Sequence, residues 1–203
     1  MKIYDCEQLS PEWQQIRLGK ITASNFANIL AKGSGKTRKG YMMKLVAEKL
    51  TGLPEASYSN SFMEWGGIET ETQARAYYEA LYDVSVKQVG FVELNEWVGC
   101  SPDGLVGEDG LIEIKCPKST THVSNILANK MQSTYNPQVQ GQMWVTGHKW
   151  CDWISFDPRV KSRPFFMVRV KRDEKYIKVL EANTEQFIKE MKEIIAQLTK
   201  SEF

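Results

Sequence analysis

The sequence predicts an α/β (α+β) fold in which helices flank a central mixed β-sheet, and three features of its pattern indicate this. The first 80 or so residues carry helix start and stop signals. From Val84 to Lys115 the pattern changes to short apolar runs with the alternation typical of strands. The remainder mixes helical and strand patterns, which completes a layered arrangement. With 203 residues and 42% hydrophobic content, we expect one core and a single domain over residues 1–203.

Helices are predicted for most of the N-terminal half. Ser10-Pro11-Glu12 is a helix start, because serine caps the backbone, proline fits the first position and an acid favours the first turn. This helix should end near Gly19, and a second should begin at Ile21 and continue to Leu30. Residues 32–40 are expected to form a flexible basic loop. Further helices are expected at 41–50 and, after a loop to about residue 60, at 61–81.

The C-terminal part is predicted to supply the sheet and its covering helices. Strands are expected at 84–92, 97–101, 111–115, 148–157 and 165–170. Helices are expected at 120–131 and 137–146. A last helix at 183–198 has its apolar residues on one stripe, which is typical of a helix packed on a core.

Composition excludes several classes of protein. A net charge of +1 excludes a uniformly basic DNA-binding protein, so nucleic-acid binding would need a local patch. No apolar run approaches the roughly 18 residues of a membrane helix, and the start does not resemble a signal peptide. The four cysteines form no C-x-x-C pair, which favours reduced thiols. We therefore expect a cytoplasmic protein that does not contact membranes.

One short stretch carries most of the chemistry: Ser101-Pro102-Asp103, then nine residues, then Glu113-Ile114-Lys115. Successive strand residues point to opposite faces, so Glu113 and Lys115 should share a face and Ile114 should point away. Asp103 lies in a turn after the strand at 97–101, and pairing of that strand with the one at 111–115 would bring Asp103 to Glu113. Two carboxylates and a lysine at one point would make a site suited to Mg²⁺, and an Mg²⁺ ion that still holds water molecules can activate one of them. The alternative is that Asp103 belongs to an ordinary surface turn and that Glu113 and Lys115 form an ion pair at the edge of a strand.

Other residues could complete such a site. Glu71, on the predicted helix at 61–81, could be a third acid, although Glu69 and Glu71 could both face solvent. Arg17, Ser24 and Ser101 could bind a phosphate, because arginine offers a planar fork and serines offer short donors. A surface arginine and a plain helix cap are the alternatives for the first two.

Two tempting motifs are rejected. Gly33-Ser34-Gly35-Lys36-Thr37 is not a P-loop, because that motif requires glycine where Leu30 stands and a preceding strand. His122 and His148 are the only histidines and lie far apart, which favours structural roles over a metal site.

Taken together in order, the motifs resemble one family. They are Ile16 to Ser24, Trp65-Gly66 with Glu71 and Ala74, Cys100 to Leu105, Glu113 to Pro117, Gln138 to Gln140 with Met143 to Thr146, and Arg172 to Tyr176. This set, from about Trp13 to Leu198, resembles the phage alkaline exonucleases typified by the phage lambda enzyme, with the YqaJ-type viral recombinase domain. That family belongs to the PD-(D/E)XK nucleases and implies their restriction-endonuclease-like core.

The resemblance implies residue roles. Mg²⁺ would be held by the carboxylates of Asp103 and Glu113 and by the backbone carbonyl of Ile114, with Glu71 binding a metal directly or through water. Lys115 would position the attacking water and help deprotonate it, and Gln138 would orient the water or a neighbour. Arg17, Ser24 and Ser101 would hold the 5′ phosphate of the degraded strand.

The resemblance also implies an activity. It would be a Mg²⁺-dependent 5′→3′ exonuclease, with two ions in the family's manner and with Mn²⁺ as a substitute, that degrades one strand of linear double-stranded DNA to mononucleotides and leaves a 3′ tail. A homotrimeric ring, a single-strand annealing protein as partner, and phage or prophage origin in a bacterial host follow from it. A lysine acts as a base only when its pKa falls or the pH is high, so an alkaline optimum is expected.

Two other functions stay open. A PD-(D/E)XK endonuclease would carry the same acids and lysine. Its relatives with a C-terminal iron–sulfur cluster fit less well, because the last cysteine is Cys151. A non-catalytic DNA-binding recombination scaffold could keep the fold, but would be expected to lack one of the site residues.

Overall fold

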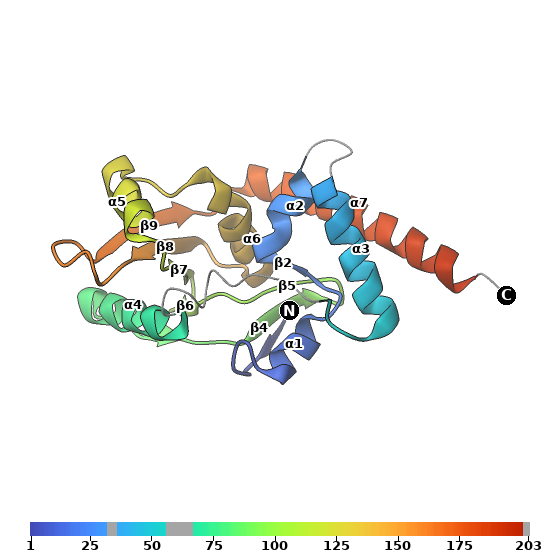
Figure 1. The fold of residues 1–203 in the computed structure, drawn as a ribbon, viewed down its shortest axis with the longest axis horizontal. Coiled ribbons are helices and arrows are strands. Elements are labelled where there is room, and N and C mark those ends of the chain that lie inside the picture. Colours follow the sequence, from blue (N-terminus) through green and yellow to red (C-terminus); the bar gives the residue numbers. More distant parts are fainter. Residues whose placement is uncertain (32–35, 56–66, 201–203) are drawn as a thin grey trace.

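Two mixed β-sheets form the centre of the protein (Figure 1). The computed structural model describes residues 1–31, 36–55 and 67–200. The first sheet has the order β1 (Lys2–Tyr4), β4 (Phe91–Asn95), β5 (Val98–Cys100) and β2 (Ile21–Thr22). The second has the order β3 (Val86–Lys87), β6 (Gly104–Val106), β7 (Gly110–Lys115), β8 (Trp150–Phe156) and β9 (Phe165–Lys171). The mixed α/β class is thus confirmed, with two sheets in place of one.

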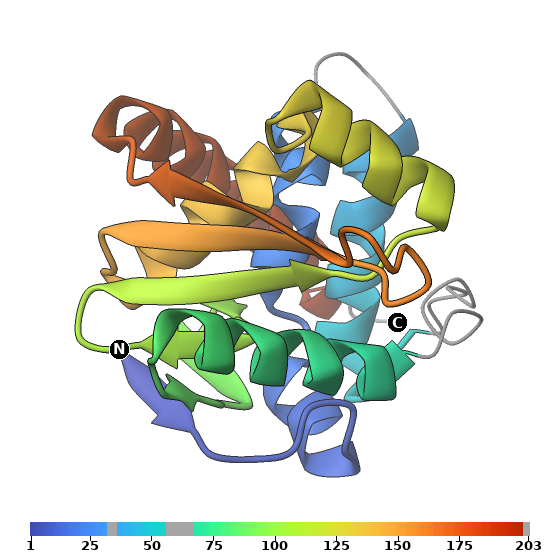
Figure 2. The same cartoon turned by 90° about the vertical axis from the view of Figure 1, so that its left-hand side faces the viewer.

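Helices cover both sheets. They are α1 (Pro11–Arg17), α2 (Phe26–Leu30), α3 (Lys36–Thr51), α4 (Gly67–Tyr82), α5 (Ser119–Ala128), α6 (Asn136–Thr146) and α7 (Glu174–Thr199), with short 3-10 turns η1 (Ala23–Asn25) and η3 (Ser133–Tyr135). Helix α4 lies along one side of the five-stranded sheet and α5 lies on the other (Figure 2). Within the described ranges, no helix is both long enough and apolar enough to cross a membrane.

Two predicted elements in the N-terminal half were wrong in part. Ile21 and Thr22 form strand β2, parallel to β5, and only the residues after them turn into helix. Both side chains are buried, so pairing in the sheet outweighs helix formation here. The basic loop expected at 32–40 is helical from Lys36 onward. Its first four residues, and residues 61–66 of the predicted fourth helix, lie outside the described part of the chain.

The predicted strand at 84–92 belongs to two different sheets. Residues 86–87 pair with β6 in the second sheet, and residues 91–95 pair with β1 and β5 in the first. Gly90 lies in the crossing, where a Cβ atom would stand 2.2 Å from the carbonyl oxygen of Cys6. Only glycine therefore allows the N-terminal arm to lie this close to the crossing.

The last helix begins nine residues earlier than predicted. The side chain of Asp173 accepts hydrogen bonds from the backbone amides of Lys175 and Tyr176, both 3.0 Å long, and so caps α7. An aspartate at this position satisfies amides that a helix leaves free. The apolar stripe starts at Ile177 and Leu180, both buried, one turn into the helix.

Strand β7 divides its side chains between two cores. Ile112 and Ile114 pack with α4, in a cluster with Ala74 and Tyr78. Leu111 belongs to the larger core on the other face, beneath α6. Glu113 and Lys115 alternate in step with Leu111, so strand alternation turns both toward α6. The prediction that these two side chains share one face of the strand therefore agrees with the structure.

The hairpin that presents Glu113 is not the predicted one. Strand β7 pairs antiparallel with β6, whereas β5 pairs with β4 and β2 in the other sheet. Asp103 therefore lies in the crossing from the first sheet to the second, immediately before β6. Each of the two sheets has a hydrophobic face that must be buried. The chain buries both because it leaves the first sheet after Cys100 and enters the second at β6.

Candidate active site

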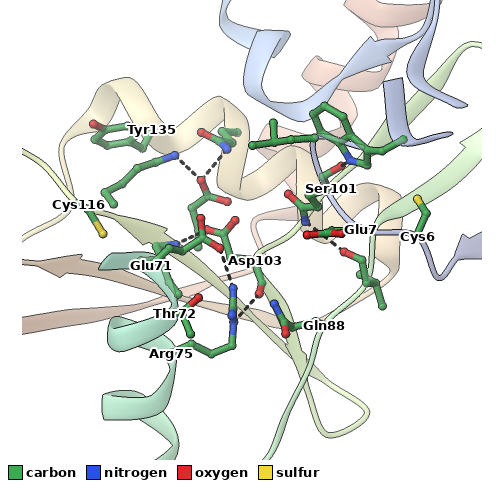
Figure 3. A pocket seen from close by; sticks show the side chains of 18 of the residues that line it. Cys6, Glu7, Glu71, Thr72, Arg75, Gln88, Ser101, Asp103, Cys116 and Tyr135 are labelled. Carbon is green, nitrogen blue, oxygen red and sulfur yellow. Dashed lines mark hydrogen bonds and ion pairs between the residues drawn. The ribbon is translucent and has the colours of Figure 1, made fainter. Parts of the chain in front are cut away.

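A cavity of about 900 Å³ opens where the two sheets meet (Figure 3). The N-terminal arm, α4, the end of β7 and the start of α6 contribute to its wall. Its acidic lining residues are Asp5, Glu7, Glu71, Asp103 and Glu113, and its basic ones are Arg75, Lys115 and Lys118. Carboxylates outnumber cations, so the cavity attracts a cation and repels an unaccompanied phosphate.

Glu113 is the best-anchored of these acids. Its side chain is 2% exposed, and each of its oxygens accepts hydrogen bonds. Oε1 accepts from Nε2 of Gln138 at 2.7 Å and from Nζ of Lys115, and Oε2 accepts from Nε2 of Gln142 at 2.6 Å. The carboxylate is thus fixed in place, since donors of several kinds satisfy it.

Asp103 reaches β7 from the crossing between the sheets. Its Oδ2 accepts a 2.5 Å hydrogen bond from the backbone amide of Ile114, so the predicted approach of Asp103 to this strand is present. Burial raises the pKa of Asp103 well above its usual range, and the nearby charges of Glu113 and Glu71 raise it further. A carboxylate held against other carboxylates gains from a cation placed among them.

Helix α4 supplies Glu71 to the cavity, whereas Glu69 is exposed to solvent, which settles the choice between them in position. Oε1 of Glu71 accepts a 2.7 Å hydrogen bond from Nη2 of Arg75, one turn later on the helix. Burial raises the pKa of Glu71, and Arg75 opposes that rise. Nε of Arg75 also donates to the carbonyl oxygen of Asp103 at 3.2 Å, so this arginine joins the two acidic elements.

Lys115 is a protonated amine in this arrangement. Burial alone would lower its pKa, but the charges of Glu113 and Asp103 outweigh burial and raise the pKa above its usual range. Its Nζ also lies 5.3 Å from the ring centre of Tyr135, close enough for a cation–π contact. When no metal ion neutralises Glu113 and Asp103, Lys115 keeps its proton and acts as a hydrogen-bond donor. It would become a base only at high pH.

The predicted phosphate-binding residues divide into two groups. Ser101 lines the cavity, and its Oγ accepts a 2.9 Å hydrogen bond from Nε1 of Trp13. Arg17 does not line the cavity, but its guanidinium stacks 3.7 Å from the ring centre of Trp13 and its buried Nε has no hydrogen-bond partner. Ser24 is exposed and follows β2, whose parallel pairing with β5 brings it to the same sheet edge as Ser101.

The donor chemistry of the site fits a hard divalent cation. Asp103, Glu113 and Glu71 offer carboxylate oxygens from three separate elements around one cavity, which is the ligand type that Mg²⁺ prefers. Over the described ranges, no three acidic, histidine or cysteine side chains already converge as a metal site. The reason is that the oxygens of Glu113 face Lys115 and two glutamines, while Asp103 faces the Ile114 amide.

Three residues that shape this site were not predicted from the sequence: Gln142, Arg75 and Trp13. Helical spacing could have found the first two, because Gln142 follows the predicted Gln138 by four residues and Arg75 follows Glu71 by four. Trp13 had no such signal. Its contact with Ser101 joins residues 88 positions apart in the sequence.

The histidines take structural positions. Both ring nitrogens of the buried His122 are hydrogen-bonded, to Oγ of Ser155 at 2.8 Å and to the carbonyl oxygen of Arg163 at 2.9 Å. Nδ1 of His148 lies 3.2 Å from the carbonyl oxygen of Thr146. Neither histidine lines the cavity. The four cysteines are free thiols.

Comparison with known proteins finds one matching family and several similar solved structures. The pattern of the YqaJ-like viral recombinase domain matches residues 12–149. The alkaline exonuclease LHK-Exo of Laribacter hongkongensis is 38% identical, with a TM-score of 0.86 over 94% of this chain and 97% of that one. Its complex with dAMP gives 37% identity and a TM-score of 0.87 over the same shares.

Two further proteins are similar over smaller shares or at lower identity. The protein ExoD of Escherichia coli K12 is 34% identical over 68 residues, which are 34% of this chain and 78% of that protein. A phage-related exonuclease of Haemophilus somnus 129PT shares the fold, with a TM-score of 0.65 and 18% identity over 88% of this chain and 96% of that one.

Proposed function

The chain belongs to the family of YqaJ-like viral recombinase domains, and from this membership and the geometry of its cavity we propose that it is a Mg²⁺-dependent DNA exonuclease. The substrate is linear double-stranded DNA, of which one strand is degraded from its 5′ end to mononucleotides. The product is a duplex with a 3′ single-stranded tail. The observation that carries the proposal is the meeting of Asp103, Glu113, Lys115 and Glu71 at one carboxylate-rich cavity.

Mg²⁺, with Mn²⁺ as a substitute, accounts for how such a cavity could accept DNA. The carboxylates of Asp103, Glu113 and Glu71 and the carbonyl oxygen of Ile114 would hold it, as one ion or a pair. The ion supplies charge neutralisation at the phosphodiester and makes a water molecule more acidic. Without a cation, the excess of carboxylates would repel the phosphate.

The chain's own residues would then orient the reactants. Gln138 and Gln142 keep both oxygens of Glu113 in fixed positions. Lys115 donates hydrogen bonds next to that carboxylate, where it can orient the attacking water and, at alkaline pH, accept its proton. Ser101, through Trp13, connects the cavity to Arg17, and these residues with Ser24 would hold the terminal 5′ phosphate.

The relatives support the substrate and the product. LHK-Exo is an alkaline exonuclease and has been solved with dAMP, a mononucleotide of the kind such an enzyme would release. We also propose that this chain works as a homotrimeric ring around the DNA, with a single-strand annealing protein as partner. It would act on phage or prophage DNA in the cytoplasm of a bacterial host.

The test is digestion of a 5′-end-labelled linear duplex with and without Mg²⁺. We expect mononucleotide release that needs the metal and prefers a 5′-phosphorylated end to a 5′-hydroxyl end. Asp103→Ala and Lys115→Ala should each abolish release, while Glu69→Ala, an exposed acid on α4, should leave it unchanged.

A covalently closed circle of the same sequence is the matched control. Cleavage of the circle would identify an endonuclease instead. A wild-type protein that binds the duplex but cuts neither form would be a recombination scaffold, and the proposal would be wrong.

A further inference from the structure

Leu9 has a backbone conformation that a leucine rarely adopts. Its φ angle is 70°, in the left-handed region. In the described part of the chain only two other non-glycine residues have a positive φ, Asp83 and Asn129. Aspartate and asparagine tolerate this region because their short side chains bond to the local backbone, but leucine does not. Leu9 therefore occupies a turn position where glycine would be the favourable residue.

The surrounding contacts hold this turn firmly in place. The amide of Ser10 donates to the carbonyl oxygen of Glu7 at 3.2 Å, which closes the turn over Leu9. Nε2 of Gln8 donates to the carbonyl oxygens of Val89 and Pro102, both at 3.1 Å. Pro102 immediately precedes Asp103, so the turn is joined directly to the loop that carries this acid.

Burial of the Leu9 side chain does little to offset this backbone strain. Its side chain is 46% exposed and belongs to neither hydrophobic core. It nevertheless lines the cavity that holds Asp103 and Glu113, on the wall formed by the N-terminal arm. Strained residues that folding does not require concentrate at sites where ligands bind.

We propose that Leu9 contacts the substrate directly, by packing its side chain against a nucleobase of the DNA strand in the cavity. The proposal rests on the proposed function, since it names how that site grips its substrate. Leucine has no hydrogen-bond donor for a phosphate, and the neighbouring cavity-lining residues Asp5 and Glu7 repel phosphates. The apolar face of a base is the part of a nucleotide that fits such a wall.

Two substitutions remove the contact and keep the turn. Leu9→Gly and Leu9→Asn both suit a positive φ, so their melting temperatures should equal or exceed that of the wild type. Both should lower kcat/KM on a linear duplex roughly five-fold, as expected for the loss of a contact worth about 1 kcal/mol. Leu9→Met keeps an apolar side chain and should stay within about two-fold of the wild type.

Asp83→Gly is the control for strain. It relieves a positive φ of 51° at a residue that does not line the cavity. It should leave kcat/KM unchanged. A loss of activity in Asp83→Gly equal to that in Leu9→Gly would show that glycine in a strained turn acts through general flexibility, which overturns the proposal.

The decisive substrates are duplexes with a single abasic nucleotide at the first, second or third position from the 5′ end. At one position the loss caused by Leu9→Gly and Leu9→Asn should shrink to less than about two-fold, because the base that Leu9 contacts is missing. An equal loss on all three duplexes, no loss on the intact duplex, or a melting temperature below that of the wild type would each overturn the proposal. A wild type that degrades no linear duplex would overturn the proposed function as well, whereas an active wild type matched by Leu9→Gly overturns only the role of Leu9.

Discussion

Oε2 of Glu113 accepts a 2.6 Å hydrogen bond from the side-chain amide of Gln142, one helical turn after the glutamine that bonds to Oε1. The two glutamines of α6 therefore hold the two oxygens of one buried carboxylate. Lys115 supplies the charge that this carboxylate needs. The arrangement fixes Glu113 from three directions, which is what a residue that must present oxygens to a cation requires.

Gln142→Leu should reduce the rate of digestion more than it reduces substrate binding. The substitution keeps the volume of the side chain but leaves Oε2 of Glu113 without its donor, so the carboxylate can turn. We expect kcat to fall about ten-fold or more, with KM within about two-fold. Steady-state kinetics on a linear duplex measures both. A rise in KM of about ten-fold with kcat unchanged would mean that Gln142 acts on substrate binding and would contradict this prediction.

Gln140→Leu provides the matched control for that variant. Gln140 lies on the same helix, but its amide donates to the carbonyl oxygen of Lys171 and its carbonyl accepts from the amide of Asp173. Its loss should lower the melting temperature and leave kcat of the folded protein close to that of the wild type.

Asp103→Asn should make the metal-free protein more stable while abolishing activity. Burial and the charges of Glu113 and Glu71 raise the pKa of Asp103, so its ionised form destabilises the folded state. Asparagine keeps an acceptor for the Ile114 amide and removes the charge. In EDTA we expect the melting temperature to rise by roughly 2–4 °C, the shift that about 1 kcal/mol gives in a chain of this size.

The change in melting temperature on adding Mg²⁺ distinguishes the loss of the Asp103 charge from a change in side-chain packing. Mg²⁺ should raise the melting temperature of the wild type and do so much less for Asp103→Asn, because binding to the folded state stabilises it. Glu69→Gln, at the exposed acid on α4, should respond to Mg²⁺ as the wild type does. Equal Mg²⁺ responses in all three proteins would remove Asp103 from the proposed ligands.

Arg17→Ala should remove the preference for a 5′ phosphate. The guanidinium has a buried nitrogen without a partner and reaches the cavity wall through Trp13 and Ser101. We expect kcat/KM on 5′-phosphorylated ends to fall at least ten-fold, about 1.4 kcal/mol, while the rate on 5′-hydroxyl ends stays nearly constant. Arg163→Ala, at an exposed arginine, should leave the preference intact. Equal losses on both ends would assign Arg17 to folding.

Asp157→Asn should lower stability at neutral pH but not in acid. Burial alone would raise the pKa of Asp157, but hydrogen bonds from Arg159 and Ser119 outweigh burial and lower it from 3.8 to about 2. A carboxyl group whose pKa is lower in the folded state stabilises that state at pH values above its pKa in the unfolded chain. For Asp157 this contribution disappears as the pH falls through about 2. We expect a loss of about 1–2 kcal/mol at pH 7, allowing for solvent screening of the exposed Arg159.

Urea unfolding between pH 7 and pH 2 measures that loss. The difference between the wild type and Asp157→Asn should narrow steadily toward the acid end. Asp109→Asn breaks an ion pair in which both side chains are more than half exposed, and it should change stability little at any pH. A difference that stays constant down to pH 2 would show that Asp157 contributes through shape and not through charge.

The sequence predicted local elements well where one signal acted alone. Ser10 and Pro11 placed the start of α1 correctly, because capping depends on the first turn only. It failed where pairing with distant strands decided the outcome. Ile21 and Thr22 carry no local mark of their partner β5, and the run at 84–92 carries no mark of the change of sheet at Gly90.

At the site, spacing predicted one strand face and tertiary structure decided the rest. Alternation alone put Glu113 and Lys115 together, since the period of a strand is two. It could not show that β6, and not β5, pairs with β7, or that Glu71 enters the cavity while Glu69 faces solvent. Those outcomes depend on how α4 and the first sheet pack against the second.

The sequence by itself determined the mixed α/β class, the cap of α1 at Ser10 and the side-by-side placement of Glu113 and Lys115, because each follows from residues within a few positions of one another. Only the tertiary structure decided that Gln142 and Arg75 support the carboxylates and that Trp13 joins Ser101 to Arg17. It also held the turn at Leu9 against the loop of Asp103. These contacts join residues up to 94 positions apart, and burial of two hydrophobic faces brings such residues together in a way that no local pattern records.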